Sequence, residues 1–320
     1  MSPYEEVVPS ESTPLRLDRF LAASGRWGSR ARVHRLIEAG CVFVNDKPAR
    51  PSTRVRPGDR IRVLEERLAE ETSEKVRPSD IPLDVLFEDE DLLVVDKPPG
   101  LVVHPAPGHW QDTLVSALLH RWKEPAPGLD ALRPGIVHRL DKDTSGVLVV
   151  CKNLRTLEAL ARQFRERAVR KEYLAVVWGV PARASGTIDR PIGRHPVERK
   201  RMAVRSEGRP ARTRFERVAS YGKVSLLRLY PETGRTHQIR VHLASAGHPV
   251  VGDRVYGRSR AEATRQLGVT RQLLHASALG FRHPRTGEEV FFEAPLPEDM
   301  RSVLERCAET AESKSGRGVS

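Results

Sequence analysis

The chain has 320 residues, of which 39% are hydrophobic, and this length suits one large domain together with a small one. Its 54 Lys and Arg residues outnumber its 42 Asp and Glu residues, and the resulting formal charge of +12 favours a polyanionic partner, above all a nucleic acid. Three widely separated cysteines argue against a disulfide framework and a thiolate metal site. Without an apolar leader or a run of ~18 apolar residues, the protein is expected to be soluble and cytoplasmic, with no membrane contact.

The first predicted unit covers residues 15–64, after an N-terminal tail over 1–14. It carries twelve basic and four acidic side chains, so that 12 − 4 = +8 of the net charge is concentrated there. Apolar residues at helical spacing predict two short helices, around 17–21 and 33–37, the second of them capped by Ser29. Short strands are predicted at 41–44 and 59–63. The unit is therefore expected to be a small α+β module.

Residues 65–80 are predicted to be a linker, because they contain six acidic and three basic residues and few apolar ones. The stretch from 81 to 308 is predicted to form an α+β domain built on an extended mixed, mainly antiparallel sheet. Its predicted strands are 85–87, 92–95, 146–151, 173–178, 224–229, 273–279 and 290–292, and its predicted helices are 114–122, 154–164 and 237–246. Residues 309–320 are predicted to be a disordered tail.

Asp141 is the carboxylate on which the chemistry is expected to centre. It follows the short apolar segment Ile136–Val137 and precedes residues 144–146, a predicted turn into the next strand. A turn between strands can present a carboxylate at a cleft, although an aspartate in a turn more often caps the backbone. Arg139 and Lys142 are neighbouring cations that could keep the carboxylate ionised or bind a phosphate.

A second cluster lies at residues 233–240, TGRTHQIR, where a turn leads into a helix with an apolar stripe. Arg235 and Arg240 are placed near the start of that helix, where backbone N–H groups and guanidinium groups converge on an anion or a carboxylate. A solvated arginine pair is the plainer alternative. Tyr173 lies in a predicted strand, where an ordinary packing role is the alternative to a place in a site.

Several common motifs are missing from the sequence. There is no G-x-x-x-x-G-K-[ST], no G-x-G-x-x-G after a strand, no H-E-x-x-H and no paired Cys/His spacing. ATP, dinucleotide and zinc chemistry are therefore disfavoured.

Taken together, the motifs resemble those of the RluA family of RNA pseudouridine synthases. Residues 138–146, HRLDKDTSG, are similar to the catalytic signature of that family, and residues 15–64 resemble an S4 RNA-binding domain. The resemblance spans roughly residues 15–308 and is strongest to the large-subunit synthase D type, which modifies a helix 69-like stem-loop of the large rRNA. Further matching blocks, in order, are 89–91, 96–98, 101–105, 170–173, 233–240 and 274–276.

The resemblance implies roles for individual residues. Asp141 would be the nucleophile or a nucleophile-like catalyst, Tyr173 the active-site aromatic and Arg240 the ion-pair partner of Asp141. Arg139 would fill the gap left by a flipped uridine, with Thr144 also in contact with the substrate. The remaining implied contacts are Leu274 with the substrate and Arg16, Arg30, Arg32, Arg35 and Lys47 with RNA.

The implied reaction turns a uracil base so that it is rejoined to the ribose through C5. Nothing is added, lost or oxidised, so no cofactor and no metal are expected. The expected partner is large-subunit rRNA or the assembling 50S subunit, and the protein is expected to be a monomer.

Three alternatives remain open on the sequence. The enzyme could act on other 23S rRNA or tRNA sites, or the chain could be a non-catalytic RNA-binding factor in ribosome assembly. Asp141 and Asp143 could also form an aspartyl-phosphate site with magnesium, as in haloacid-dehalogenase-like phosphatases. Ser145 disfavours that last interpretation, because the pattern requires Thr or Val at its position.

Overall fold

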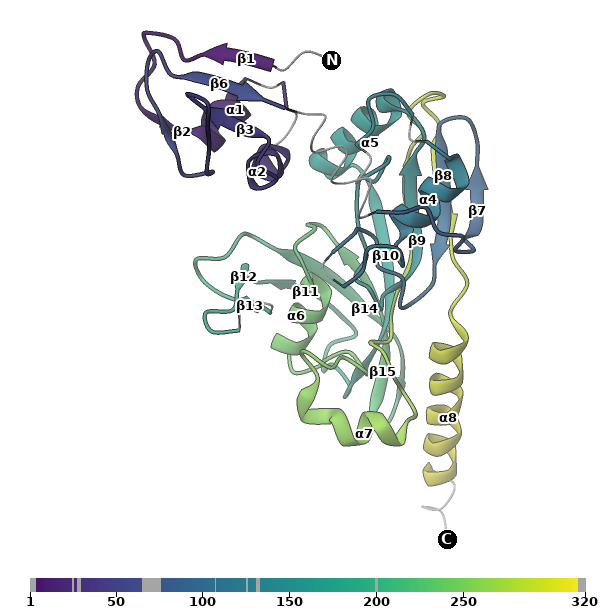
Figure 1. The fold of residues 1–320 in the computed structure, drawn as a ribbon. Coiled ribbons are helices and arrows are strands. Elements are labelled where there is room, and N and C mark those ends of the chain that lie inside the picture. Colours follow the sequence, from purple (N-terminus) through teal and green to yellow (C-terminus); the bar gives the residue numbers. More distant parts are fainter. Residues whose placement is uncertain are drawn as a thin grey trace. The chain divides into compact units, whose positions relative to one another are not determined.

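The computed structural model describes residues 4–24, 26–27, 30–64, 76–106, 108–124, 126–130, 133–198 and 201–315. The chain divides into two compact units, Met1–Arg77 and Pro78–Ser320 (Figure 1). The division falls within the stretch 65–80 that the sequence analysis expected to be a linker. Residues 65–75 of that stretch lie outside the described part.

The first unit combines two helices with short antiparallel strands. Its larger sheet has the strand order β1-β6-β3-β4, and β2 pairs with β5. Leu17 and Leu21 of the first helix and Leu36 of the second are buried together with Ile61 of the sheet. The elements are β1 (Tyr4–Val7), β2 (Leu15–Arg16), α1 (Leu17–Ala23), α2 (Arg30–Glu38), β3 (Val42–Val44), β4 (Lys47–Pro48), β5 (Arg54–Val55) and β6 (Arg60–Val63).

The N-terminal segment departs from the expectation of a tail over residues 1–14. Tyr4–Val7 forms β1, which pairs antiparallel with β6, so the prediction is wrong for this segment. Glu5 lies opposite Arg62 in that register, and opposite charges across a strand pair stabilise it. The partner strand is about 55 residues away in the chain, and a local composition signal does not contain such a contact.

The second unit is built on one long mixed sheet. Within the described residues its strands run in the order β11-β14-β15-β10-β16-β9-β8-β7, and β17 pairs with β16. The strands are β7 (Asp84–Glu88), β8 (Leu92–Lys97), β9 (Ser145–Cys151), β10 (Arg170–Trp178), β11 (Ser185–Asp189), β14 (Arg212–Tyr221), β15 (Val224–Pro231), β16 (Leu274–Arg282) and β17 (Glu289–Glu293). A separate ribbon consists of β12 (Ile192–Arg194) and β13 (Met202–Val204). The predicted α+β class with a mixed, mainly antiparallel sheet is confirmed.

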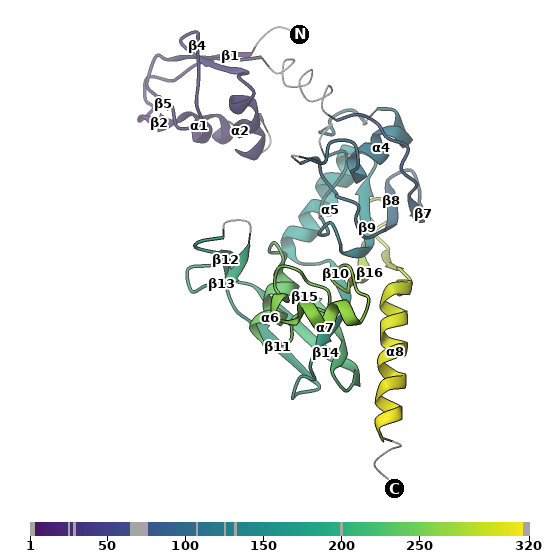
Figure 2. The same ribbon diagram turned by 60° about the horizontal axis from the view of Figure 1, so that its bottom comes forward.

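Helices accompany both halves of this sheet (Figures 1 and 2). In both views α4 and α5 lie with the β7–β9 half, and α6 lies with the β14–β15 half. The helices are α4 (Leu114–Trp122), α5 (Leu154–Glu166), α6 (Gln238–Ser245), α7 (Ala261–Gln266) and α8 (Glu298–Ser315), with a 3-10 turn at Arg258–Arg260. No helix of the described residues is both long and apolar enough to cross a membrane.

The two halves of the sheet meet where β16 and β9 pair in parallel, at the start of both strands. His275 lies opposite Ser145 and Ala276 lies opposite Gly146. Gly146 has a φ of +114°, and a Cβ atom placed on it would lie 2.2 Å from the carbonyl oxygen of Ala276. A glycine is therefore required at this junction, because a side chain would collide with the neighbouring backbone.

The C-terminal helix also departs from the sequence-based expectation. Residues 309–320 were expected to be disordered, yet α8 continues to Ser315, so the prediction is wrong over 309–315, while 316–320 lie outside the described part. Met300, Val303 and Leu304 anchor α8 by packing into a buried cluster on the sheet. The segment that follows is polar, which suggested disorder. It is also rich in Ala and Glu, which both have high helix propensity.

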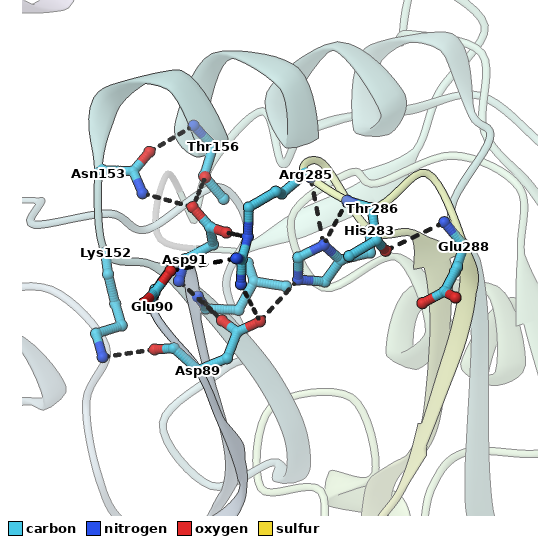
Figure 3. Close-up of polar contacts among 11 residues, drawn as sticks. Asp89, Glu90, Asp91, Lys152, Asn153, Thr156, His283, Arg285, Thr286 and Glu288 are labelled. Atoms are coloured by element: carbon cyan, nitrogen blue, oxygen red, sulfur yellow. Dashed lines mark hydrogen bonds and ion pairs between the residues drawn. The ribbon is translucent and has the colours of Figure 1, made fainter.

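A polar network joins the β16–β17 hairpin to the β7–β8 turn (Figure 3). Arg285 Nε donates to Asp91 Oδ2 at 2.5 Å, and His283 Nε2 lies 3.0 Å from Asp89 Oδ2. The other carboxylate oxygen of Asp91 accepts from Asn153, the N-cap of α5. Burial raises the pKa of Asp91, but the hydrogen bonds from Asn153 and Arg285 outweigh it and hold the pKa below its usual value. The network ties three separate chain segments together.

Candidate active site

A cavity of about 590 Å³ opens on the second unit and holds every catalytic and substrate-binding residue that the sequence analysis proposed. Five chain segments line it: the loop before β9, the end of α5, the start of β10, the turn after β15 with the beginning of α6, and the start of β16. The proposed residues in its wall are Arg139, Asp141, Thr144, Tyr173, Arg240 and Leu274. Residues up to 135 positions apart in sequence therefore share one cavity.

Two buried basic side chains, Lys97 and Arg271, bind the backbone of the loop that carries Asp141. The amide of Thr144 donates to the carbonyl oxygen of Asp141 at 3.0 Å, which closes a turn over residues 141–144, earlier than the predicted turn at 144–146, because Ser145 already begins β9. Lys97 Nζ donates to the carbonyl oxygen of Lys142 at 3.0 Å, and Arg271 Nη1 donates to that of Asp143 at 3.1 Å. Such contacts restrict the backbone and leave the Asp141 side chain, 21% exposed, to face the cavity.

Arg240, the third residue of α6, joins Asp141 to a second carboxylate. Its Nη1 donates to Asp141 Oδ2 at 2.9 Å, while Nε and Nη2 donate to the two oxygens of Asp253 at 2.7 and 3.0 Å. Burial lowers the pKa of Arg240, but Asp253 and Asp141 outweigh it and raise the pKa above its usual value. The guanidinium therefore stays charged and binds the Asp141 carboxylate in one fixed direction.

Asp253 is fully buried, and Arg240 determines its ionisation. Burial raises the pKa of Asp253, whereas the hydrogen bonds and charge of Arg240 lower it, and the net pKa lies below the usual value. The amides of Val255 and Tyr256 also donate to Asp253 Oδ1, at 2.9 and 3.0 Å. Asp253 is not among the site residues predicted from the sequence. Its signal is the position directly after a fully buried segment, Val250–Gly252.

Tyr173 lies at an irregularity of β10. The register between β10 and β16 shifts between Glu172 and Leu174, so Tyr173 occupies a bulge. Bulges next to active sites redirect side chains, and the Tyr173 side chain lines the cavity. Burial and the nearby charge of Asp141 raise the pKa of Tyr173 far above neutrality. The phenol is therefore protonated at physiological pH.

The cavity wall carries several cations besides Arg240. Arg165 and Arg167 lie at the end of α5, and Lys171 lies on β10. The turn before α6 adds Arg235, whose Nε donates to the carbonyl oxygen of Pro210 at 3.2 Å. With the exposed Arg139, these groups form a basic wall suited to the phosphates of a nucleic acid.

His237 is a second residue to which the sequence analysis gave no role. Its Nε2 lies 3.9 Å from Asp141 Oδ1, and its Nδ1 lies 2.9 Å from the hydroxyl of Tyr256. Tyr256 in turn accepts a hydrogen bond from the amide of Met202 at 3.0 Å, which links the β12–β13 ribbon to the site. These partners come from three separate segments, so no sequence pattern within the 233–240 cluster reveals them.

The predicted RNA-binding residues belong to the first unit. Arg16 is 43% exposed and donates to Asp18, and Lys47 is exposed on β4. Arg30, Arg32 and Arg35 lie on α2, but their side chains are outside the described part of the structure.

Asp89, Asp91 and His283 are the one group of described residues whose ligand atoms lie close enough to hold a metal ion. The guanidinium of Arg285 faces this group: its Nε lies 2.5 Å from Asp91 Oδ2, and its Nη2 lies 3.7 Å from Asp89 Oδ2 (Figure 3). The other oxygens accept backbone and side-chain hydrogen bonds. The donor set does not fit a metal ion, because a cation would have to displace Arg285.

The fold, the carboxylate in a basic cavity and the small basic unit define the class of this protein as an RNA-modifying enzyme. Residues 91–245 match the family described as RNA pseudouridylate synthase, and residues 15–61 match the S4 domain. The chain belongs to the RNA pseudouridylate synthase family. This membership rules out the phosphatase interpretation of Asp141 and Asp143.

Relatives match along nearly the whole chain. The ribosomal large subunit pseudouridine synthase D of Nitrosomonas europaea is 44% identical over 98% of this chain and 90% of its own length. The protein of that name from Xanthomonas campestris is 43% identical over 95% of this chain and 92% of its own. Among solved structures, human RNA pseudouridylate synthase domain containing 1 is 30% identical, with a TM-score of 0.55 over 73% of this chain and 96% of that one.

Proposed function

We propose that this protein isomerises specific uridines of large-subunit (23S) rRNA to pseudouridine, within a helix 69-like stem-loop. The observation that carries the proposal is the Asp141 carboxylate in a basic cavity, bound through Oδ2 by Arg240 at 2.9 Å. The relatives named ribosomal large subunit pseudouridine synthase D support the choice of RNA, because they match both units of the chain. The protein would act as a monomer in the cytoplasm, where ribosomes are assembled.

The proposed reaction begins when the target uridine leaves its stack and enters the cavity. Unstacking costs a few kcal/mol, which phosphate contacts along the basic wall offset. Arg139, exposed at the cavity, would fill the space that the uridine leaves. Tyr173 would stack on the extruded uracil, with Thr144 and Leu274 contacting it from the other segments.

Asp141 would then act on the ribose carbon C1′. Its Oδ1 attacks C1′, or stabilises positive charge there, as the C1′–N1 bond breaks and its electron pair leaves with the uracil. The uracil turns and C5 bonds to C1′; where Oδ1 has bonded to C1′, that bond breaks in the same step and its electron pair returns to the Asp141 carboxylate. The proton lost from C5 is balanced by one gained at N1. Atoms and electrons balance within the substrate, so no cofactor is required.

The S4 unit would contribute phosphate contacts away from the chemistry. Lys47 and Arg16 are exposed on it, and the arginines of α2 belong to the same unit. Contacts of this kind strengthen binding to a folded RNA without selecting the uridine itself.

Replacing the carboxylate tests the proposed chemistry. Asp141→Asn should reduce pseudouridine formation in a 23S stem-loop RNA by at least about 10³-fold, because a neutral amide cannot replace the nucleophile. RNA affinity should change less than about threefold. Asp143→Asn is the matched control, since Asp143 lies two residues away and does not line the cavity. Retained activity in Asp141→Asn would overturn the mechanism and support a non-catalytic RNA-binding role.

A second experiment tests the choice of RNA. A pseudouridine map of rRNA and tRNA from cells that lack this protein should show loss at a helix 69-like loop. Restoration by the wild-type gene, but not by the Asp141→Asn gene, connects the loss to the cavity. Loss at another 23S position or in a tRNA would refute the proposed target while leaving the reaction in place.

A further inference from the structure

We propose that His237 is a further catalytic residue, which donates a hydrogen bond from Nε2 to an oxygen of the departing uracil. The inference deepens the proposed function and rests on it. Three observations carry it: the backbone conformation of His237, the partner that orients its ring, and the position of Nε2 relative to Asp141.

The backbone of His237 is held in a conformation that disfavours a side chain. Its φ and ψ are 55° and 22°, in the left-handed region, at a cost of about 1 kcal/mol for a residue other than glycine. The other non-glycine residues with positive φ within the described ranges are Asn45 and Asp46 in a hairpin turn and Lys123 and Arg167 at helix C-caps. Those residues lie in a turn or at the C-terminal end of a helix, whereas His237 stands at the start of one.

The usual reason for a polar residue at that place is also missing. A residue preceding a helix normally accepts a hydrogen bond from a backbone amide with its side chain, but His237 makes no such bond. Its ring lines the cavity instead. The strained backbone conformation therefore directs the ring into the cavity. Backbone strain of this kind is most common at functional sites.

Tyr256 determines which ring nitrogen of His237 carries the proton. Among the described residues, the Tyr256 hydroxyl has two hydrogen-bond partners, the amide of Met202 and Nδ1 of His237. The amide can only donate, so the hydroxyl accepts from Met202, and we assign its own proton to Nδ1 because this arrangement uses the hydroxyl as both acceptor and donor. A neutral His237 then carries its proton on Nε2, the nitrogen nearer to Asp141.

The imidazole is neutral at physiological pH. Burial lowers the pKa of His237, and the charges that face it oppose one another: Asp141 and Asp253 raise the pKa, whereas Arg240 and Arg139 lower it. The net pKa lies below the usual value. His237 is therefore a hydrogen-bond donor that does not bring a second positive charge next to Arg240.

Nε2 is placed to donate a hydrogen bond to the departing uracil rather than to Asp141 itself. The 3.9 Å between Nε2 and Asp141 Oδ1 is too long for a hydrogen bond and leaves room for an acceptor bound close to C1′. Arg240 binds Oδ2, so Oδ1 is the oxygen available to C1′. The uracil atom next to the breaking C1′–N1 bond that accepts hydrogen bonds is O2.

The proposed contact acts on charge that develops during bond cleavage. As the C1′–N1 bond breaks, the electron pair spreads over N1 and the carbonyl oxygens of the uracil, and a donor placed at O2 stabilises it. No proton is transferred in this step. The hydrogen bond weakens again when C5 bonds to C1′ and the negative charge is consumed.

The test compares His237→Gly with the wild-type enzyme in single-turnover cleavage of the glycosidic bond. Glycine adopts the left-handed backbone without strain, so this variant keeps the local fold while it removes the ring. With a uridine stem-loop RNA we expect the cleavage rate to fall about 100-fold, because removing one hydrogen-bond donor to a developing oxyanion typically has an effect of this size. RNA affinity should stay within about threefold.

A better leaving group distinguishes a catalytic role from a structural one. Fluorine at C5 makes the departing uracil less basic, so it needs less stabilisation. With 5-fluorouridine RNA the loss caused by His237→Gly should shrink to about tenfold or less. His237→Gln, which keeps a donor at a similar reach, and added imidazole with His237→Gly should each recover part of the uridine rate.

Controls separate this inference from the proposed function. His195→Gly removes a histidine that does not line the cavity and should leave both rates unchanged. An equal loss on uridine and 5-fluorouridine, or no loss at all, overturns the role of His237. Asp141→Asn run in parallel should abolish cleavage of both RNAs, and if it does not, the proposed function itself fails.

Discussion

Arg240 shares one guanidinium between two carboxylates that have different surroundings. Asp253 is fully buried and binds two of its nitrogens, whereas Asp141 is partly exposed and binds the third. In the proposed reaction Asp141 loses its negative charge when Oδ1 bonds to C1′. Asp253 keeps its charge at that moment, so Arg240 remains paired and stays in position.

His275 shows a second consequence of burial at the residue scale. It lies at the parallel junction, fully buried, with Nδ1 3.0 Å from Ser145 Oγ and Nε2 3.3 Å from the carbonyl oxygen of Ala294. The carbonyl oxygen accepts a hydrogen bond from Nε2–H, so Nδ1 of the neutral ring accepts a hydrogen bond from the Ser145 hydroxyl. Burial lowers the pKa of His275 to about 4.

This pKa predicts a loss of stability in mild acid. Because His275 binds a proton below pH ~6.5 in the unfolded chain and only below about 4 in the folded one, the unfolded state binds more protons in between. As pH falls from ~6.5 to 4, the free energy of unfolding should decrease by up to ~1.4 kcal/mol per unit from this residue. Urea unfolding at several pH values measures it.

Variants assign the effect to His275. His275→Asn lacks a titrating group and should show a flatter stability profile between pH 6.5 and 4, whatever its stability at pH 7. His195→Asn should keep the wild-type slope. A slope unchanged in His275→Asn would contradict the neutral, buried state of this histidine.

At the scale of elements, α8 is held by a few apolar residues at its N-terminal end. Met300 is fully buried and Val303 is 2% exposed, in a cluster with Trp178 of β10 and with Leu273, which directly precedes β16. Arg271 adds a polar contact, since its Nε and Nη2 donate to Asp299 at 2.6 and 2.7 Å. Arg271 also binds the carbonyl oxygen of Asp143, so α8 and the loop that carries Asp141 share one buried cation.

Met300→Ala should therefore destabilise the protein. Removing a fully buried side chain of this size typically costs about 2–5 kcal/mol, because a cavity replaces the packed contacts. Glu305→Ala, an exposed position on the same helix, should change stability by less than about 0.5 kcal/mol. Chemical denaturation of the two variants gives the comparison, and equal stabilities would show that α8 is not packed as described.

Some elements could be predicted from sequence and others could not, for a physical reason. The apolar runs of β8 and β9 predict buried strands, and the predicted helix at 114–122 coincides with α4. The sequence predicts no strand at β14, whose residues RTRFERVASY combine exposed side chains such as Arg212 and Arg214 with buried and half-buried ones. Its hydrogen bonds come from β11 and β15 on either side, which local composition does not reveal.

The residues of the site likewise fall into those that a sequence motif contains and those that only the fold brings together. Asp141 and Arg240 lie in contiguous motifs that a sequence can show, and the structure brings them within 2.9 Å. Asp253, Tyr256 and His237 acquire their relationships only when the turn after α6 folds back on the helix. Contacts between segments of that kind depend on the fold rather than on any one motif.

At the scale of the whole molecule, the positive charge is unevenly distributed. Residues 15–64 carry twelve basic and four acidic side chains, a charge of 12 − 4 = +8 out of the total of +12. That segment lies in the first unit, Met1–Arg77, where acidic residues in 1–14 and 65–77 reduce the charge of the whole unit to 8 − 3 − 2 = +3, whereas the cavity lies in the second unit. Affinity for the RNA and chemistry on the uridine should therefore be separable by mutation.

Lys47→Gln tests this separation. Binding of a stem-loop RNA should become less steeply dependent on salt, with a slope of log K against log [salt] smaller by ~0.7–0.9, the effect of losing one phosphate contact. The rate at saturating RNA should not change. Arg265→Gln, an exposed cation of the second unit outside the cavity, is the control and should keep the wild-type slope. An unchanged slope for Lys47→Gln would exclude this lysine from the RNA interface.

Gly146 limits how this chain can diverge. The backbone of β16 occupies the space that any side chain at this position would need. Even alanine would therefore separate the two halves of the sheet at the start of β9, close to the loop that carries Asp141. In a library of all single substitutions, selected for function, Gly146 should be as intolerant as Asp141 itself. Variants at the two positions would lose function for different reasons. A variant at Gly146 would not form the cavity, whereas a variant at Asp141 would form the cavity without the carboxylate that the reaction requires.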